Sequence, residues 1–176
     1  MIEIVGPDAV PAIAAQLAPV LIDTIEGGAG VGWVEPPSTD EAVAWWIRLL
    51  NDPAAVTWIA RDGERILGTI TLVRAAYSNG RHRADVIKLM VHRAGRGRGI
   101  APALMGALER FAASVGVTLL VLDTHTGSLA ESLYRRWGWQ TAGEIPGFAV
   151  NTDGTLGSTT VMYKQLAGVS QEHATD

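Results

Sequence analysis

The sequence predicts an α/β domain in which helices flank both faces of a mixed, mostly antiparallel sheet. Three observations predict this fold class. Strand-like and helix-like periods of apolar residues alternate along the chain, and the pair Asp62-Gly63 separates two apolar runs as a hairpin turn does. A glycine-rich loop at residues 96–101 joins a strand pattern to a helix pattern. The chain has 176 residues, of which 48% are hydrophobic, so we expect one domain with a sizeable core.

The first half of the chain combines a short strand, two helices and a hairpin. Pro19 should bend the first helix, and the glycine-rich stretch Gly27–Trp33 ends it. Ser38 and Glu41 have the spacing of a capping box, which starts the second helix. The expected elements are a strand at residues 2–5, a helix at residues 8–24, a helix from the Ser38 cap to residue 50, and paired strands at residues 55–61 and 66–73.

The second half of the chain continues with strands and two further helices. Thr118–Asp123 is nearly all apolar, as in a strand that is buried on both faces. Ser128 and Glu131 form a second capping box, and Gly138 ends the helix that follows. The apolar stripe of this helix consists of Leu129, Leu133 and Trp137. The remaining elements are a strand at residues 84–91, a helix at residues 100–115, a strand at residues 140–150 broken at Pro146-Gly147, and a strand at residues 159–166.

Composition limits the classes of function. The net charge of −4 argues against a nucleic-acid partner. The chain has no cysteine and its four histidines lack metal-ligand spacing, so no metal is expected. The first residues lack the positive leader of a signal peptide and no apolar run is long enough for a membrane span, so we expect a cytoplasmic protein without a membrane partner. Residues 1–166 should form the domain and residues 167–176 a disordered tail.

The stretch Arg96–Ala101, RGRGIA, is typical of a phosphate-binding loop. Its glycines let the backbone approach a ligand, and the first N–H groups of the following helix have no partners within that helix. The helix dipole favours an anion at this end, and the guanidinium groups of Arg93, Arg96 and Arg98 favour a diphosphate over a carboxylate. The alternative is a strand-to-helix turn with a solvated basic face.

Two motifs resemble those of the GNAT family of N-acetyltransferases. The family's acetyl-CoA motif, Q/R-x-x-G-x-G/A, is matched by Arg96, Gly97, Arg98, Gly99, Ile100 and Ala101. A later helix motif of the family, A-x-x-x-Y-x-x-x-G-F/W, is matched by Ala130, Tyr134, Gly138 and Trp139. The resemblance implies a GNAT-like fold, acetyl-CoA as co-substrate without a metal, and direct transfer of acetyl to a primary amine in a ternary complex. It also implies that the pantetheine arm lies along Leu89, Met90 and Val91.

Direct transfer to an amine needs a base, because an alkylammonium with a pKa of ~10 keeps its proton at neutral pH. Asp85 and Asp123 are the candidates, since each interrupts an apolar stretch near the end of a strand that borders the loop. The alternatives are a solvated strand start and a turn-forming carboxylate. The resemblance favours the catalytic role and implies that Tyr134 protonates the leaving CoA thiolate. Taken alone, a tyrosine in such a helix belongs more often to the core.

Four stretches resemble, more narrowly, the tabtoxin-resistance branch of the family: GGAGVGW, ADVIKLMV, LDTHTGSLAESLY and GEIPGFAVNTDG. Enzymes of that branch acetylate an amino-acid-like toxin at its amino group. We therefore expect the loops Gly27–Trp33 and Ile145–Val150 to form an acceptor lid, with Trp33 and Phe148 as apolar walls and Asp123 in the same substrate site. The expected acceptor is a small amine. Alternatively, these loops close the fold or bury the contact of a homodimer.

Two other classes of protein fit parts of the pattern. A dinucleotide-dependent oxidoreductase would also have glycines between a strand and a helix, with an acidic residue such as Asp123 about two dozen residues later. It is disfavoured because Pro102 stands at the third glycine position and because a hairpin, not a crossover helix, precedes the loop. A non-catalytic acyl-CoA-binding sensor is compatible with both motifs, although Tyr134 and the two aspartates would then lack a role.

Overall fold

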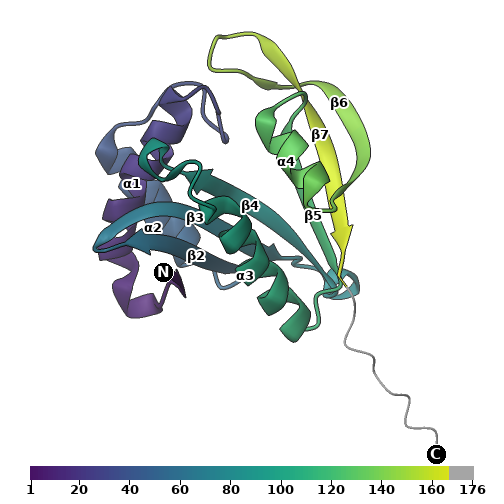
Figure 1. The fold of residues 1–176 in the computed structure, drawn as a ribbon, viewed down its shortest axis with the longest axis horizontal. Coiled ribbons are helices and arrows are strands. Elements are labelled where there is room, and N and C mark those ends of the chain that lie inside the picture. The colour runs from purple at the N-terminus through teal and green to yellow at the C-terminus, as the bar shows by residue number, and fades with distance from the viewer. Residues whose placement is uncertain (167–176) are drawn as a thin grey trace, which may run out of the picture.

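The computed structural model of the protein describes residues 1–166, which contain a seven-stranded sheet in the order β1-β2-β3-β4-β5-β7-β6 (Figure 1). The strands are β1 (Ile2–Ile4), β2 (Ala55–Asp62), β3 (Arg65–Arg74), β4 (Arg83–Val91), β5 (Leu119–His125), β6 (Gln140–Val150) and β7 (Leu156–Gln165). Neighbouring strands are antiparallel except β4 and β5, which are parallel. The predicted mixed, mostly antiparallel sheet is therefore confirmed.

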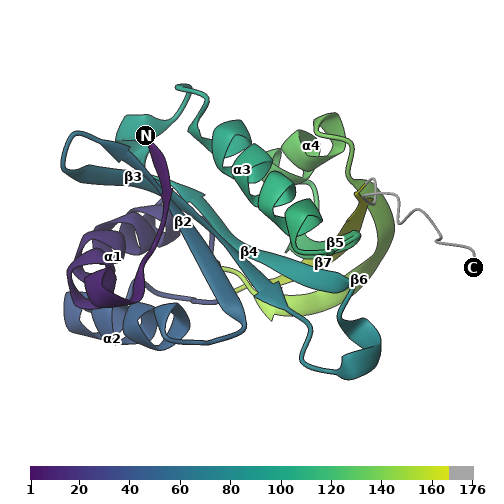
Figure 2. The same cartoon turned by 90° about the horizontal axis from the view of Figure 1, so that it is seen from below.

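Helices cover both faces of the sheet, as predicted (Figure 2). The α-helices are α1 (Val10–Glu26), α2 (Thr39–Leu50), α3 (Ile100–Ser114) and α4 (Leu129–Arg136), and the short 3-10 helices are η1 (Pro7–Ala9), η2 (Ser78–Gly80) and η3 (Arg93–Gly95). One core cluster lies between α1, α2 and the sheet around Leu21 and Trp46. A second cluster, around Leu104 and Leu108 of α3, fills the other face. Within residues 1–166, no helix combines the length and the apolar character that crossing a membrane requires.

The parallel pair of β4 and β5 is short and opens toward one end. Its residue pairs are Arg83 with Leu119, Ala84 with Leu120, and Asp85 with Val121. Beyond them, the register between β3 and β4 shifts and Lys88 adopts a φ of 55°, which marks a β-bulge in β4. Because a bulge bends its strand, β4 and β5 diverge after these three pairs.

Several local predictions are confirmed. Ser38 Oγ accepts a hydrogen bond from the Glu41 N–H, and the Glu41 carboxylate accepts one from the Ser38 N–H, so the capping box starts α2. The β2–β3 hairpin turns one residue later than predicted, because Asp62 still pairs with Arg65. Gly63 takes the first turn position with a φ of 58°, a conformation that glycine adopts without strain.

The burial of β5 differs from the prediction. Leu120 and Leu122 are buried against the α3 side of the sheet, whereas Asp123, on the other face, is exposed. The prediction of a strand buried on both faces was wrong because α1 and α2 pack against β2, β3 and β4 and do not extend over β5.

The edge strand β6 also differs from the prediction. It runs from Gln140 to Val150, with a register shift between Ile145 and Ala149 where a break at Pro146-Gly147 was expected. An edge strand tolerates proline because the missing N–H can fall on the unpaired side. The expected tail at residues 167–176 lies outside the described residues.

Candidate functional site

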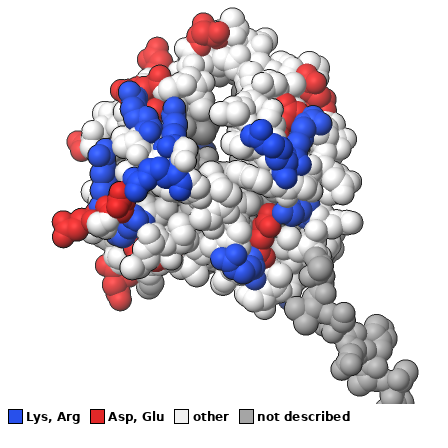
Figure 3. Space-filling model, in the orientation of Figure 1, with Lys and Arg blue, Asp and Glu red and all other residues white. Residues whose placement is uncertain are grey.

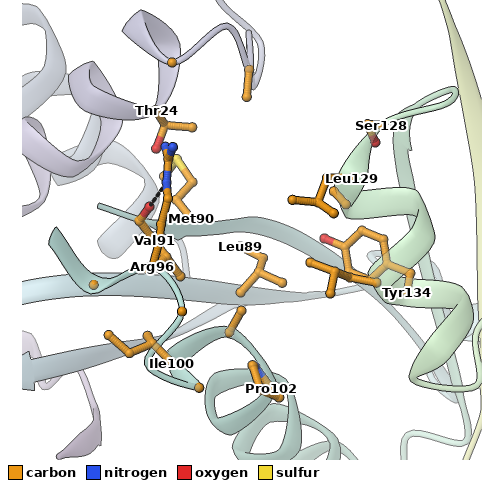
Figure 4. Close-up of a pocket in the computed structure, with 18 of the residues that line it drawn as sticks. Thr24, Leu89, Met90, Val91, Arg96, Ile100, Pro102, Ser128, Leu129 and Tyr134 are labelled. Carbon is orange, nitrogen blue, oxygen red and sulfur yellow. Dashed lines mark hydrogen bonds between the residues drawn. The ribbon is translucent and has the colours of Figure 1, made fainter. Parts of the chain in front are cut away.

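A cavity of about 640 Å³ lies where β4 and β5 separate. Figure 3 shows that the surface is hollowed between two groups of basic side chains, and Figure 4 shows the lining residues at close range. The walls come from the end of α1, from β4 after the bulge, from the loop before α3, and from α4. The lining residues are Thr24, Gly27, Gly28, Ala29, Leu89, Met90, Val91, Gly95, Arg96, Gly97, Gly99, Ile100, Ala101, Pro102, Ser128, Leu129, Ala130, Leu133, Tyr134 and Trp137.

The loop before α3 has a row of backbone donors without protein partners. In the described part of the chain, no protein acceptor binds the N–H groups of residues 97–101, and the next N–H, that of Ala103, donates to the Gly99 carbonyl at 3.2 Å. Gly97 and Gly99 both have a φ of 74°, and a Cβ added at either would meet no atom within 4 Å. Five consecutive free donors at the positive end of a helix form a cradle that fits a phosphate group.

The three arginines near this loop have different roles. Arg96 lines the cavity, where its Nε–H donates to the Val91 carbonyl at 3.4 Å (Figure 4). Arg93 is instead bound to Asp23 and Glu26 of α1. Arg98 donates to the carboxylate of Asp62 at 2.9 Å and is absent from the cavity wall. Of the three guanidinium groups expected to attract a diphosphate, the structure therefore presents that of Arg96 to the cavity.

Asp23 connects α1 to the start of the loop. This residue is 5% exposed, and its carboxylate accepts hydrogen bonds from the Arg93 N–H, at 2.8 Å, and from the Arg93 guanidinium. Burial by itself would raise the pKa of Asp23, but the hydrogen bonds from Arg93 outweigh burial and hold the pKa below its ordinary value. The ionised carboxylate thus holds the end of α1 against the residues that lead into the cradle.

Tyr134 lies in the α4 wall of the cavity, opposite Leu89 of β4 (Figure 4). The residue is 8% exposed, and its ring packs edge-on against Trp137 with a centroid distance of 5.8 Å. Burial and the negative charge of Asp123 raise the pKa of Tyr134 to about 12. Its hydroxyl group therefore stays protonated at neutral pH, and it can donate a proton or a hydrogen bond into the cavity.

The two candidate bases have different surroundings. Asp85 lies in the paired end of β4, opposite Val121, with its carboxylate 3.7 Å from the guanidinium of Arg83. Asp123 lies in β5 beyond the paired end and accepts a hydrogen bond from the Thr159 hydroxyl at 2.9 Å. The charge of Asp123, and not that of Asp85, contributes to the raised pKa of Tyr134. Asp123 is therefore within electrostatic range of Tyr134, whereas neither aspartate is part of the cavity lining.

The two aromatic residues expected in an acceptor lid lie outside the cavity wall. Trp33 is half-buried against α1 and α2, while Gly27 and Gly28 of the same loop line the cavity. Phe148 lies in the irregular part of β6 and is 53% exposed. The first loop is thus adjacent to the cavity through its glycines, and the second loop is not part of its lining.

Two features near the cavity were not predicted from the sequence: the position of the apolar stripe of α4, and Lys88, which lies beside the lining residue Leu89 without being part of the lining. The apolar stripe of α4, Leu129, Leu133 and Trp137, lines the cavity, whereas the buried residues of this helix are Glu131 and Tyr134. Lys88 at the bulge was also missed. It interrupts an apolar strand as Asp85 does, so the same pattern could have found it.

Among residues 1–166, no group of three or more histidine or acidic side chains is placed to hold a metal ion.

Comparisons with known proteins identify the family. The sequence profile of the acetyltransferase (GNAT) family matches residues 21–139, so the chain belongs to this family. N-acetyltransferase 8B of Rattus norvegicus is 35% identical over 97 residues, which cover 54% of this chain and 44% of that protein. The chain spans about half the length of the curated relatives it matches.

Solved structures share the fold over nearly the whole chain. The structure of yncA, a putative acetyltransferase from Salmonella typhimurium with its cofactor acetyl-CoA, has a TM-score of 0.76 and 18% identity, covering 99% of this chain and 98% of that one. A putative phosphinothricin N-acetyltransferase has a TM-score of 0.75 and 18% identity, with coverages of 95% and 98%. The GNAT-like fold that the two motifs implied is confirmed.

The role of Asp23 can be tested through the pH dependence of stability. The pKa of Asp23 is lower in the folded state than in the unfolded state, where it is about 3.9. The hydrogen bonds of its carboxylate therefore contribute their full stabilisation at pH values above the unfolded pKa, and this contribution is lost as the pH falls through the pKa of the folded state. Asp23→Asn should lower the free energy of unfolding at pH 7 by about 1–2 kcal/mol. The difference in the free energy of unfolding between wild type and variant, measured by denaturant unfolding, should be constant from pH 7 to about pH 5 and narrow as the pH falls further. Asp8→Asn, at an exposed position, is the control. A difference that stays constant over the whole range would contradict the assignment.

Proposed function

We propose that residues 1–166 form a single acetyltransferase domain that transfers acetyl from acetyl-CoA to the primary amine of a small molecule. The observation that carries this proposal is the row of five free N–H groups at the start of α3, next to a cavity whose opposite wall holds the protonated Tyr134. Membership of the GNAT family supports the chemistry, and the acetyl-CoA of the Salmonella neighbour supports the co-substrate.

The residues around the cavity fit acetyl-CoA. The N–H groups of residues 97–101 and the guanidinium of Arg96 would bind the diphosphate. The pantetheine arm would lie along Leu89–Val91, with Leu129 and Leu133 of α4 covering its apolar parts. When bound, acetyl-CoA supplies an acetyl group activated as a thioester.

Asp123 and Tyr134 divide the proton transfers between them. Asp123 accepts the proton that an alkylammonium acceptor must lose, directly or through water, so that the free amine can attack the thioester carbonyl in the ternary complex. Tyr134, with a pKa of about 12, carries the proton that the leaving sulfur needs. The influence of Asp123 on the pKa of Tyr134 supports a shared site for both residues.

The proposed acceptor is a small amino-acid-like amine or antimetabolite. A narrower version of this proposal is that acetylation of such a compound confers resistance to a toxin. Similarity in fold to a putative phosphinothricin N-acetyltransferase supports this class, as does the resemblance to the tabtoxin-resistance branch. The loop Gly27–Trp33 already borders the cavity, and Trp33 and Phe148 would become walls only if the loops close over an acceptor. Every residue of β6 is exposed, which is also compatible with the alternative contact in a homodimer.

A thiol-release assay with acetyl-CoA tests the proposed function. The purified protein is mixed with acetyl-CoA and a panel of free amino acids, dipeptides, polyamines, amino-bearing antimetabolites and histone-like peptides, and free CoA is measured. Turnover with small amines supports the proposal. Binding of acetyl-CoA without turnover of any amine would instead identify the alternative, a non-catalytic acyl-CoA sensor. A preference for the histone-like peptides would overturn the substrate class.

Gly99→Glu should abolish acetyl-CoA binding, because the added carboxylate would occupy the cradle and repel the diphosphate. Isothermal titration calorimetry with acetyl-CoA measures the effect. Gly116→Glu is a matched control, since Gly116 flanks the other end of α3 with a φ of 79° and equally open surroundings. Both variants therefore carry the same backbone strain, and wild-type affinity in Gly99→Glu would refute the cradle.

Tyr134→Phe should lower kcat by about 10²-fold and leave the Kd of acetyl-CoA unchanged, because the ring remains and the proton donor is lost. Steady-state kinetics and calorimetry on the same preparation separate the two effects. Tyr163→Phe removes the hydroxyl group that donates to Gln140 at 2.7 Å and serves as control. Equal turnover in wild type and Tyr134→Phe would exclude Tyr134 as the acid.

Asp123→Asn should lower kcat/KM by about 10²-fold at pH 7, where the acceptor is protonated. The loss should shrink at alkaline pH, because the free amine then becomes abundant without a base. Asp85→Asn decides between the two candidates, and we expect it to keep the wild-type pH profile since Asp85 lies beside Arg83 at the paired end. The opposite result, a changed profile in Asp85→Asn alone, would reassign the base.

A further inference from the structure

Lys88 is a charged residue at the bulge that opens the site, and the proposed mechanism does not use it. It adopts a φ of 55° in β4, directly before the cavity-lining residues Leu89–Val91. The bulge sends its side chain toward α2 and the loop Gly27–Trp33. Gly27 and Gly28 of that loop line the cavity, and Lys88 contacts the same loop a few residues further along, at Val31.

The contacts of Lys88 leave its ammonium group incompletely satisfied. Nζ donates one hydrogen bond, to the Val31 carbonyl at 2.5 Å, and lies 5.0 Å from the centroid of the Trp45 ring. An added Cβ at Gly32 would lie 3.5 Å from Nζ, so the loop backbone packs closely around the charge. An ammonium has three N–H donors, and one carbonyl and one aromatic ring are neutral partners. Within residues 1–166, no carboxylate forms an ion pair with this charge.

The negative charge of Asp123 acts on the pKa of Lys88. Burial lowers the pKa of Lys88, and the charge of Asp123 offsets part of this effect. The two side chains are therefore within electrostatic range of each other, although they do not touch. They come from β4 and β5, the two strands that separate here. Asp123 stands two residues beyond the last β4–β5 pair and Lys88 three residues beyond it, and both side chains lie on the face of the sheet opposite α3. A positive and a negative group thus stand on opposite sides of the gap between the two strands.

We propose that Lys88 is the specificity-determining residue of the acceptor site and binds the carboxylate of a zwitterionic acceptor. The inference rests on the proposed function, in which Asp123 receives the amine end of the same molecule. A carboxylate would provide the charged acceptor that the two free N–H groups of Lys88 lack. Amino acids and short peptides should therefore be preferred over amines of the same size that have no carboxylate.

The test compares acceptors that differ only in the carboxylate. Free amino acids and glycyl dipeptides are assayed by thiol release beside their amides and their decarboxylated amines. The wild type should favour each acid over its amide by about tenfold or more in kcat/KM, as expected for a charge-assisted hydrogen bond. In Lys88→Met the ratio should fall to about one, mainly through a higher KM for the acid, and Lys88→Arg should restore part of it. Arg81→Met, at an exposed position near the paired end of β4, should keep the wild-type ratio.

Three outcomes would overturn the inference. If Lys88 only fastens the Gly27–Trp33 loop, Lys88→Met would lower kcat/KM equally for acids, amides and amines and leave the ratio unchanged. If the wild type itself accepts amides as well as acids, the carboxylate is not recognised, whatever the variants do. If the wild type releases no CoA with any probe, the proposed function fails, and this inference fails with it. In the first two outcomes the wild type still releases CoA, so they overturn this inference and leave the proposed function standing.

Discussion

The separation of β4 from β5 is the constraint on which the rest of the site depends. Three residue pairs join the strands, and the bulge at Lys88 then bends β4 away. In a continuous sheet, ladder hydrogen bonds and side chains would fill this space. Because the ladder stops, the loop before α3 and the ring of Tyr134 border one opening, and Asp123 lies in β5 just beyond the last β4–β5 pair.

In the described part of the chain, most of the groups at this opening that suit an anion are backbone N–H groups. The charges of Arg93 and Arg98 are compensated by Asp23, Glu26 and Asp62. Arg96 lines the cavity, although its guanidinium also lies 3.9 Å from the carboxylate of Asp23. The row of free N–H groups is held in place by the fold, so it needs little reorganisation to bind a phosphate. This arrangement explains how a chain with a net charge of −4 can offer a site for a polyanion such as acetyl-CoA.

The orientation of α4 follows from a buried charge and not from its apolar stripe. The carboxylate of Glu131 accepts hydrogen bonds from the Gly127 N–H and from Arg135, each at 2.6 Å, and these bonds lower the pKa of Glu131. With Glu131 and Tyr134 on the buried side, Leu129 and Leu133 point to the cavity. Leu129 and Leu133 thus form part of the cavity wall, and the same helix positions Tyr134.

The sequence by itself determined the features that depend on neighbouring residues. The Ser38–Glu41 cap, the β2–β3 hairpin and the free donors of residues 97–101 each arise within a few residues of chain, so local patterns predicted them. The tertiary structure decided the features that depend on which elements pack against the two faces of the sheet. The one-sided burial of β5, the closeness of Asp123 to Tyr134, and the inward position of Lys88 follow from which helices cover which strands and from where β4 bends. The periodicity of a single segment carries no information about the packing on its two faces, which is why the tertiary structure alone could decide them.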